Sequence, residues 1–232
     1  MAPVTEPTEI AKNLSAHGLI LRGGFVFSDG EQAPAGPFGR PTKSVLLVGQ
    51  AGAAPWPHFQ QWLSARPGRP KNPLDTWARE VIGGVAEKFG ASAVSPSDRP
   101  YLPFQQWAIR AEGLRPSPLG ILMHPEYGLW HAYRGALLFD AEVLIPEPRE
   151  VSHLCDACAE KPCMKACPVD AHAGGGFAYN DCLAHVRGAA GGVCRDTGCL
   201  DRNVCPYGVA YRYPVEVQAF HMAAFAGLAD GR

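Results

Sequence analysis

The clearest pattern of hydrophobic and polar positions lies between residues 73 and 89. Its apolar side chains recur at steps of three and four residues, which places them on one face of a helix: Leu74, Trp77, Ala78, Val81, Ile82, Val85 and Phe89. Asn72 stands where an N-cap is expected, Pro73 occupies the first helical position, and Gly90 follows the end. The pattern therefore predicts a long helix with one face turned towards a hydrophobic core.

Shorter patterns predict the other elements. Runs that read as strand material occupy residues 18–28, 44–49, 119–123 and 129–139, and His124–Gly128 joins the last two. Further helices are expected at residues 8–16, 55–65 and 102–111, and another after Pro214. Strands mixed with helices, without an internal repeat in residues 1–145, predict the α+β fold class.

The distribution of cysteines predicts two domains. All eight cysteines lie between Cys155 and Cys205, and the first 154 residues contain none. We expect one domain at residues 1–148 and another at residues 149–232, with the linker at Pro146-Glu147-Pro148, because prolines resist continuation of helix or sheet. The second domain is small, so we expect bound metal to stabilise it.

The cysteine spacing predicts two metal sites with four thiolates each. The first run is Cys155-x2-Cys158-x4-Cys163-x3-Cys167-Pro168; Cys182 follows alone, and the second run is Cys194-x4-Cys199-x5-Cys205-Pro206. A Cys-Pro step at the end of a run is typical of two-cluster ferredoxins, in which that cysteine ligates the other cluster. Two structural zinc sites are the alternative, because the pairs Cys155/Cys158 and Cys194/Cys199 have zinc-like spacing. The two Cys-Pro steps favour iron–sulfur clusters, although the first run has two extra residues before its third cysteine.

Composition narrows the class of partners. The 232-residue chain has a net charge of −1, which predicts no broad basic face and makes nucleic acid an unfavoured partner. The first residues show neither the basic nor the apolar region of a signal peptide, and no apolar stretch is long enough to span a membrane. We therefore expect a cytoplasmic protein, in which clustered cysteines bind metal rather than form disulfides.

The cysteine-rich half resembles the ferredoxin-like domain of epoxyqueuosine reductases, which are cobalamin-dependent enzymes with two 4Fe–4S clusters. The likeness is carried by the isolated Cys182, in Asn-Asp-Cys-Leu-Ala-His, between two Cys-Pro runs. It implies crossed ligation by two sets of cysteines. One cluster would be held by Cys155, Cys158, Cys163 and Cys205, and the other by Cys167, Cys182, Cys194 and Cys199.

The first half is similar to the cobalamin C family of cobalamin-processing proteins. The likeness is carried by Leu119-Gly-Ile-Leu-Met-His-Pro-Glu-Tyr-Gly-Leu-Trp-His-Ala-Tyr-Arg-Gly-Ala-Leu-Leu-Phe139 and extends upstream to Asp75 and to Pro96-x-x-Arg99-Pro100. It covers roughly residues 43–145. The resemblance implies a nitroreductase-like α+β fold that binds cobalamin with its lower base displaced and removes the upper ligand.

Carried over residue by residue, the resemblance implies a corrin pocket lined by Gly120, Leu122, Tyr127, Trp130, Tyr133 and Arg134. Arg134 would be a cationic handle. Ser95 stands where the family has a histidine, so no role of that histidine is transferred. Asp98 is a candidate catalytic acid by comparison with epoxyqueuosine reductases, one position out of register. The alternative is that His124–Gly128 is only a turn and that Trp130 and Tyr133 are core aromatics.

These patterns lead to one functional hypothesis and two alternatives. The first is a cobalamin-binding oxidoreductase that reduces and dealkylates or decyanates corrinoids, with electrons relayed through two 4Fe–4S clusters from an external flavodoxin, ferredoxin or reductase. The second is a corrinoid-dependent reductase of another small substrate. The third is a simple electron-transfer ferredoxin whose first domain docks a partner.

Overall fold

The computed structural model describes residues 7–145 and 150–228. Its contacts divide the chain into two units, each described by itself: a first unit of Met1–Gly113 with Ala132–Val151, and a second unit of Leu114–His131 with Ser152–Arg232. The second unit therefore includes a loop from the middle of the chain, Leu114–His131, besides the cysteine-rich segment. The linker expected at Pro146–Pro148 lies outside the described residues.

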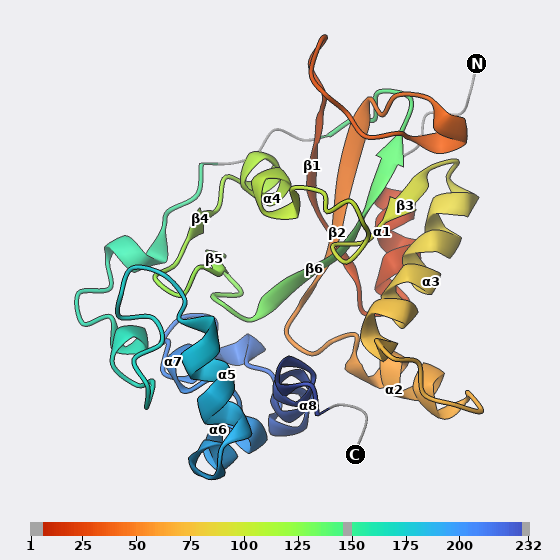
Figure 1. Ribbon diagram of the computed structural model, residues 1–232. Helices are drawn as coiled ribbons and strands as arrows, with labels where there is room; N and C mark the ends of the chain where they lie inside the picture. Colours follow the sequence, from red (N-terminus) through yellow and green to blue (C-terminus); the bar gives the residue numbers. More distant parts are fainter. Residues whose placement is uncertain (1–6, 146–149, 229–232) are drawn as a thin grey trace. The chain divides into compact units, whose positions relative to one another are not determined.

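The first unit is built on a four-stranded sheet in the order β1-β2-β6-β3 (Figure 1). Its strands are β1 (Ile20–Val26), β2 (Ser44–Ala51), β3 (Ser92–Val94) and β6 (His131–Phe139). The pairs β1–β2 and β3–β6 are antiparallel, and the β1–β2 register shifts between Leu21 and Gly24. The strands expected at 18–28, 44–49 and 129–139 are confirmed within a few residues.

Helices enclose this sheet, which explains why β2 is buried along almost its whole length. The helices of the first unit are α1 (Pro7–Ser15), α2 (Trp56–Ser64), α3 (Pro73–Lys88) and α4 (Phe104–Glu112), with a 3-10 turn η1 (Pro37–Gly39). Figure 1 shows α3 and α4 on opposite sides of the sheet. A strand covered on both faces needs no alternating polar residues, and the run Val45–Val48 is accordingly continuous in hydrophobic residues.

The amphipathic helix predicted from residue 73 is confirmed as α3. The apolar face predicted for it includes Trp77 and Ile82, and both are almost fully buried. Asn72 occupies the N-cap position but makes no capping bond with its side chain. Its carbonyl instead accepts hydrogen bonds from the backbone and the hydroxyl of Thr76, at 2.9 Å each.

The second unit contains little sheet and many short helices. A two-stranded hairpin pairs β4 (Arg115–Pro116) with β5 (Leu122–Met123). The helices are α5 (Tyr179–Arg187), α6 (Gly192–Thr197), α7 (Leu200–Asn203) and α8 (Val215–Ala226), with 3-10 turns η2 (Leu154–Asp156), η3 (Pro162–Met164), η4 (Ala189–Gly191) and η5 (Val209–Tyr211). The helix expected after Pro214 is confirmed as α8.

The strand expected at residues 119–123 is too long. Only Leu122 and Met123 pair with a neighbouring strand. The preceding residues form a turn in which the Gly120 amide donates to the Ser117 carbonyl at 2.9 Å. Gly120 has φ +75°, a left-handed conformation that breaks a regular strand and that glycine takes without strain.

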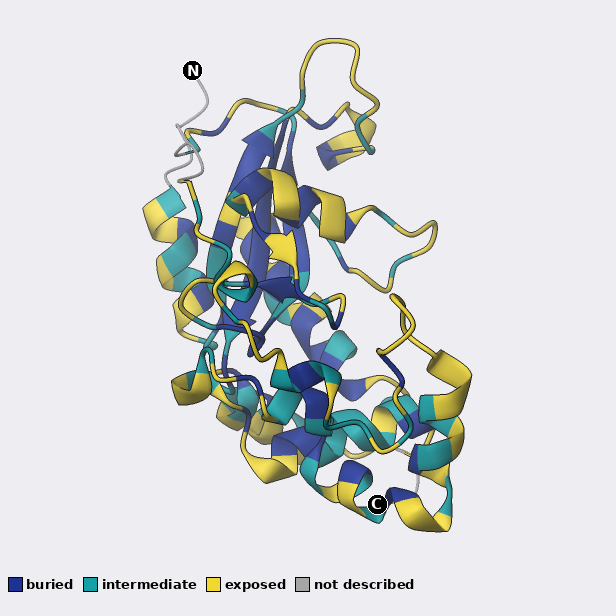
Figure 2. Ribbon diagram, turned by 90° about the vertical axis from the view of Figure 1, so that its left-hand side faces the viewer, coloured by how far each residue is buried: buried dark blue, intermediate teal, exposed yellow. Residues whose placement is uncertain are grey.

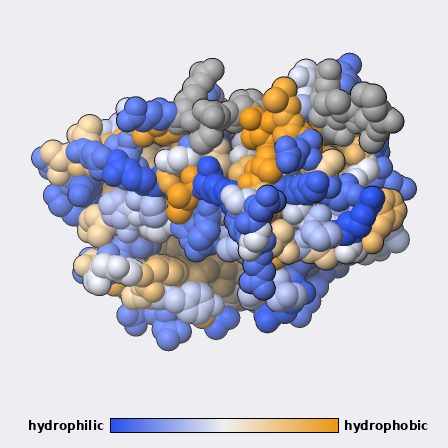
Figure 3. Space-filling model, turned by 90° about the horizontal axis from the view of Figure 1, so that it is seen from above, coloured by the Kyte–Doolittle hydropathy of each residue, from blue (hydrophilic) through white to orange (hydrophobic). Residues whose placement is uncertain are grey.

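Buried residues follow the sheet and the adjoining helix faces, as the dark blue ribbon in Figure 2 shows. The face in Figure 3 is mostly hydrophilic with small hydrophobic patches. No helix among the described residues is long and apolar enough to cross a membrane.

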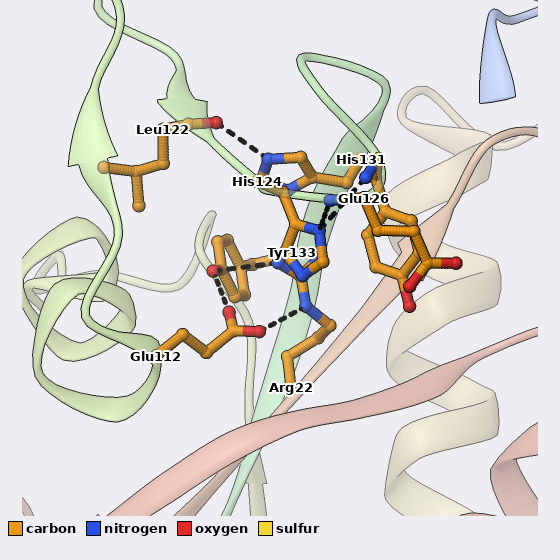
Figure 4. A network of polar contacts seen from close by, with 8 residues as sticks. Arg22, Glu112, Leu122, His124, Glu126, His131 and Tyr133 are labelled. Carbon is orange, nitrogen blue, oxygen red and sulfur yellow. Dashed lines mark hydrogen bonds and ion pairs between the residues drawn. The ribbon is translucent and has the colours of Figure 1, made fainter. Parts of the chain in front are cut away.

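A buried ion pair stabilises the first unit. Arg22 on β1 has a side chain that is 2% exposed, and its Nε donates to Glu112 at the end of α4 at 2.8 Å. The Tyr133 hydroxyl on β6 also donates to Glu112, and the Arg22 guanidinium lies 4.7 Å from the centre of the Tyr133 ring (Figure 4). One ion pair thus links two strands to a helix.

We predict that Arg22→Met lowers the free energy of unfolding by about 3–5 kcal/mol, because Glu112, whose side chain is only 15% exposed, would lose its counter-charge. Urea unfolding followed by circular dichroism measures the change. The control is Arg40→Met, which removes an ion pair with Asp140 whose arginine side chain is 61% exposed, and which should cost less than about 1 kcal/mol. Equal losses in the two variants would contradict a stabilising role of the buried pair.

Candidate functional site

The structure gathers the eight cysteines around two cavities of the second unit. The first cavity is lined by Cys155, Cys158, Cys163 and Cys205. The second cavity is lined by Cys167, Cys182, Cys194 and Cys199. These are the two crossed sets that the resemblance implied, and each contains cysteines from segments far apart in the sequence.

The crossing arises from two segments that each contribute one cysteine to each cavity. The segment from Cys163 to Cys167 contains η3, and the segment from Cys199 to Cys205 contains α7. The two segments pack against each other through α7 and η3. Each helical element ends before the Cys-Pro step that closes its segment, η3 at Met164 and α7 at Asn203.

The second cavity is roomy and apolar. Its volume is about 370 Å³, and apart from the sulfur atoms its walls include Val186, Leu200, Met222 and Phe225. Val186 and Cys194 belong to one hydrophobic cluster, against which Cys182 and Leu200 pack. Such walls offer water few hydrogen-bonding partners and lower the local dielectric constant around any group bound between the thiols.

The first cavity is much smaller, with a volume of about 10 Å³, and it is also apolar. Met123 and Leu129 line it together with Pro206 and Tyr207. Cys163 and Cys205 are buried in the same hydrophobic cluster as Met123 and Leu129. The loop Leu114–His131 therefore supplies one wall of this cavity.

Burial disfavours the free thiolates. It raises the pKa of Cys155 and of Cys182 to about 11, and neighbouring thiols of the same cavity add to both shifts. Burial also raises the pKa of Cys163, Cys194, Cys199 and Cys205. Metal binding at these thiols must consequently release protons, and the metal's charge must compensate for the loss of hydration.

The donor sets fit iron–sulfur clusters. Among the described residues, no three or more His, Cys, Asp or Glu side chains are arranged to hold a single metal ion. A 4Fe–4S cluster makes a different demand, because each of its four thiolates binds a different iron and the sulfur atoms surround the whole cluster. The second cavity, with four cysteines around about 370 Å³, meets that demand. The first has the same four-cysteine donor set around only about 10 Å³, so a cluster there would require its walls to move apart.

The residues expected to bind a corrin divide between the two units. Gly120, Leu122, Tyr127 and Trp130 belong to the second unit, and Tyr133 and Arg134 belong to the first. Of the first group, Gly120 lines the second cavity, between Leu119 and Ile121, which line it too. Leu122 and Trp130 are buried within the second unit, where they are core residues.

The histidines near Gly120 have structural roles within the second unit. His124 Nδ1 accepts hydrogen bonds from the backbone amides of Glu126 and Tyr127, at 3.1 Å each, and His124 and Gly128 close the turn with a β-bridge (Figure 4). The His124 ring stacks on Tyr127 at 3.9 Å. His131 Nε2 bonds to the Leu122 carbonyl at 2.8 Å. The segment His124–Gly128 is therefore a turn that joins β5 to β6, as the sequence predicted.

The remaining candidates are held by polar contacts of the first unit. Burial raises the pKa of Tyr133 far above its usual value, although Arg22 opposes the shift, so the phenol stays protonated. Arg134 Nε donates to Gln50 at 2.6 Å. Asp98 accepts from Arg79 at 2.8 Å and from the Ser95 amide at 2.7 Å, which ties it into a turn. These contacts give Asp98 a structural role and supply no evidence for catalysis.

Sequence reasoning missed how the loop Leu114–His131 is fixed in the second unit. Arg202 donates to the Leu129 carbonyl at 2.6 Å, and its guanidinium lies 4.4 Å from the Trp130 ring centre. Gly128 (φ +58°) and Gly208 (φ +67°) let two backbone segments approach each other closely. Only the position of Arg202 between Cys199 and Cys205 could have drawn attention to it.

Comparisons with known proteins show the fold. No protein-family model matches the sequence, and no curated protein matches it. A crystal structure of selenomethionine-labelled epoxyqueuosine reductase matches with a TM-score of 0.55 and 13% identity, over 91% of this chain and 68% of that one. Another, with an epoxyqueuosine-modified tRNA-Tyr stem loop, has a TM-score of 0.51 and 15% identity, over 90% of this chain and 66% of that one.

A second kind of protein is equally similar. The C. elegans B12-trafficking protein CblC, a homologue of human MMACHC, matches with a TM-score of 0.54 and 14% identity, over 96% of this chain and 92% of that one. This chain spans about two thirds of the length of the reductases. The expected mixed α/β fold is thus confirmed, and it resembles the folds of both kinds of protein.

We predict that Gly128→Ala and Gly208→Ala each lower the free energy of unfolding by more than about 1 kcal/mol. A Cβ atom at Gly128 would lie 2.3 Å from the Tyr207 carbonyl oxygen, and one at Gly208 would lie 2.2 Å from that of Tyr127. Gly174→Ala is the control, because no atom lies within 4 Å of its Cβ position. Chemical denaturation measures the three variants. A tolerated alanine at Gly128 or Gly208 would refute the close backbone approach.

Proposed function

We propose that this chain is an iron–sulfur redox protein that binds a corrinoid and processes it reductively, by cobalt reduction and removal of the upper ligand. One observation supports this proposal above the others. Leu119, Gly120 and Ile121, which belong to the stretch resembling cobalamin C proteins, line the same cavity as four of the cysteines. A corrin-binding loop and a cluster site would then share one wall.

The cysteines would hold two 4Fe–4S clusters, one in each cavity. When bound, such clusters supply one-electron transfer, at potentials that depend on hydrogen bonds to sulfur and on solvent exposure. Around Cys167 the chain sets both the hydrogen bonding to sulfur and the solvent exposure. The Ala171 amide donates to its sulfur at 3.4 Å, and the apolar walls of the second cavity limit access of water.

The loop Leu114–His131 would present the corrinoid to the second cavity. Gly120 has no side chain, and no atom lies within 4 Å of its Cβ position, so a flat macrocycle can approach the backbone closely. Arg202 and the Gly128–Gly208 contact hold the loop at its other end. The loop and the cysteines belong to the same unit. The contacts of Arg202 and Gly208 would therefore hold a corrinoid bound at the loop at a fixed distance from the second cavity.

The two predicted corrin residues of the first unit are held by contacts within that unit. Tyr133 keeps its proton because burial raises its pKa, and it donates that proton in a hydrogen bond to Glu112. Arg134 is oriented by Gln50. The proposed corrinoid site therefore rests on the loop of the second unit.

The likeness to epoxyqueuosine reductases supports a second candidate, a corrinoid-dependent reductase of another small substrate. One of these reductases was crystallised with a tRNA stem loop. A net charge of −1 offers this chain little non-specific attraction to RNA, so we propose a small organic molecule for this alternative. In either case an external flavodoxin, ferredoxin or reductase would supply electrons.

We predict that anaerobically prepared protein binds about eight irons per chain, the sum of two four-iron clusters. Cys163→Ser and Cys194→Ser each remove a ligand from a different cavity, so each variant should retain about half of the iron. Iron and zinc analysis with absorption spectroscopy measures the content.

Two tightly bound zinc ions without iron in the unaltered chain would contradict the cluster assignment. Simultaneous loss of all iron in both serine variants would contradict the division of the cysteines into two sites, provided that circular dichroism shows both variants folded.

We predict that Gly120→Asp abolishes corrinoid binding, because a carboxylate would stand where the macrocycle approaches. Titration of the full chain with hydroxocobalamin, followed by the corrin absorption bands, should show base-off binding in the unaltered protein and none in the variant. Gly175→Asp is the matched control, since Gly175 has φ +76° and equally open space around its Cβ position.

The iron content of both aspartate variants should equal that of the unaltered chain. Corrin bands that remain unchanged on addition of the unaltered, iron-replete protein would leave an electron-transfer ferredoxin as the correct interpretation. Equal binding by the two aspartate variants would place the corrinoid elsewhere.

A further inference from the structure

One carboxylate is buried at the place where the two cysteine-bearing segments meet. Asp201 is 1% exposed and lies between Cys199 and Cys205 on α7. Its Oδ1 accepts a hydrogen bond from the Ala166 amide at 3.0 Å, and its Oδ2 accepts one from His172 Nδ1 at 2.8 Å. A carboxylate so deeply buried is costly unless it has partners, and here both of its oxygen atoms are hydrogen-bonded.

These bonds join the two segments at their crossing. Ala166 lies directly before Cys167, in the segment that sends Cys163 to the first cavity and Cys167 to the second. Asp201 follows Cys199 by two residues, in the segment that sends Cys199 to the second cavity and Cys205 to the first. A single side chain therefore links the two segments that carry four of the cysteines, two lining each cavity.

His172 extends the link to the wall of the second cavity. It is 9% exposed, lines that cavity, and stacks on Phe177 with ring centres 5.1 Å apart. Since a carboxylate can only accept, Nδ1 of His172 carries the hydrogen of this bond. Asp201 thus orients an aromatic ring of the cavity as well as the backbone before Cys167.

The charge of Asp201 reaches both cavities. Asp201 follows Cys199, which lines the second cavity, and precedes Cys205, which lines the first, and its Oδ1 bonds to the amide directly before Cys167. A buried carboxylate beside both sites disfavours the addition of an electron at either, because each added electron increases the local negative charge.

We propose that Asp201 is a positioning residue for the pair of iron–sulfur sites: its carboxylate fixes the spacing of the two clusters and lowers the reduction potentials of both. The inference rests on the proposed presence of the clusters. It gives a residue that is not a cysteine control over the distance between the two sites and over their reduction potentials.

Asp201→Asn tests the charge. Asparagine keeps the size and one oxygen acceptor for the Ala166 amide but removes the negative charge. In the full, anaerobically prepared chain, we expect wild-type iron content and a shift of both reduction potentials to more positive values, measured by dithionite titration followed by EPR. Asp181→Asn is the matched control, because Asp181 is next to Cys182 but exposed to water, which screens its charge.

Asp201→Ala tests the positioning, because it removes both acceptors. The two reduced clusters of the unaltered protein should broaden each other's EPR signals, and this broadening should decrease in the alanine variant. If that variant does not accumulate as folded protein, the reduction potentials of Asp201→Asn alone test the inference.

Potentials of Asp201→Asn equal to those of the unaltered chain, or shifted no more than those of Asp181→Asn, would overturn the inference while the cluster proposal stands. Unchanged broadening in iron-replete Asp201→Ala would overturn the positioning role. An unaltered chain without iron would overturn the proposed function and this inference together.

Discussion

The second unit depends on bringing eight cysteine thiols into two apolar cavities. Its hydrophobic clusters include several of the cysteines, so the proposed cluster ligands are also core residues. Burial raises the pKa of most of these thiols, so binding of the proposed clusters would require their deprotonation. Folding and cluster binding would then be linked in this unit, whereas the core of the first unit contains no cysteine.

The crossing of two short segments gives the cavities their composition. Each segment contributes one cysteine to each cavity, so both segments must be in place before either four-cysteine set is complete. Asp201 lies at this crossing with its carboxylate fully hydrogen-bonded, while Arg202, its neighbour in sequence, holds the loop Leu114–His131. Adjacent residues of one short helix thus connect the cysteine segments to each other and to the loop that we propose to bind the corrinoid.

In the first unit the main constraint is the pairing of polar groups beneath the helices that cover the sheet. Its sheet is covered on both faces, and the ion pair Arg22–Glu112 satisfies polar groups that the covering helices would otherwise bury alone. Tyr133 takes part in the same network, so this residue, which the resemblance implied for a corrin pocket, has a structural role in the first unit. The fold matches those of epoxyqueuosine reductases and of a B12-trafficking protein at 13–15% identity, a level at which the arrangement of elements is shared and the site must be argued from its own residues.

The sequence by itself determined the elements with strong local patterns. Helix α3 and the strands β1, β2 and β6 follow from apolar periodicity, and the cysteine spacing with the Cys-Pro steps predicted two four-cysteine sites. It could not determine which unit the loop Leu114–His131 joins, because that choice depends on contacts with Arg202 and Gly208, residues distant in sequence. The left-handed turn at Gly120 and the burial of Asp201 were likewise decided only by tertiary structure. Local periodicity records which face of an element is buried, whereas a carboxylate between two cavities is stabilised by partners that no local pattern specifies.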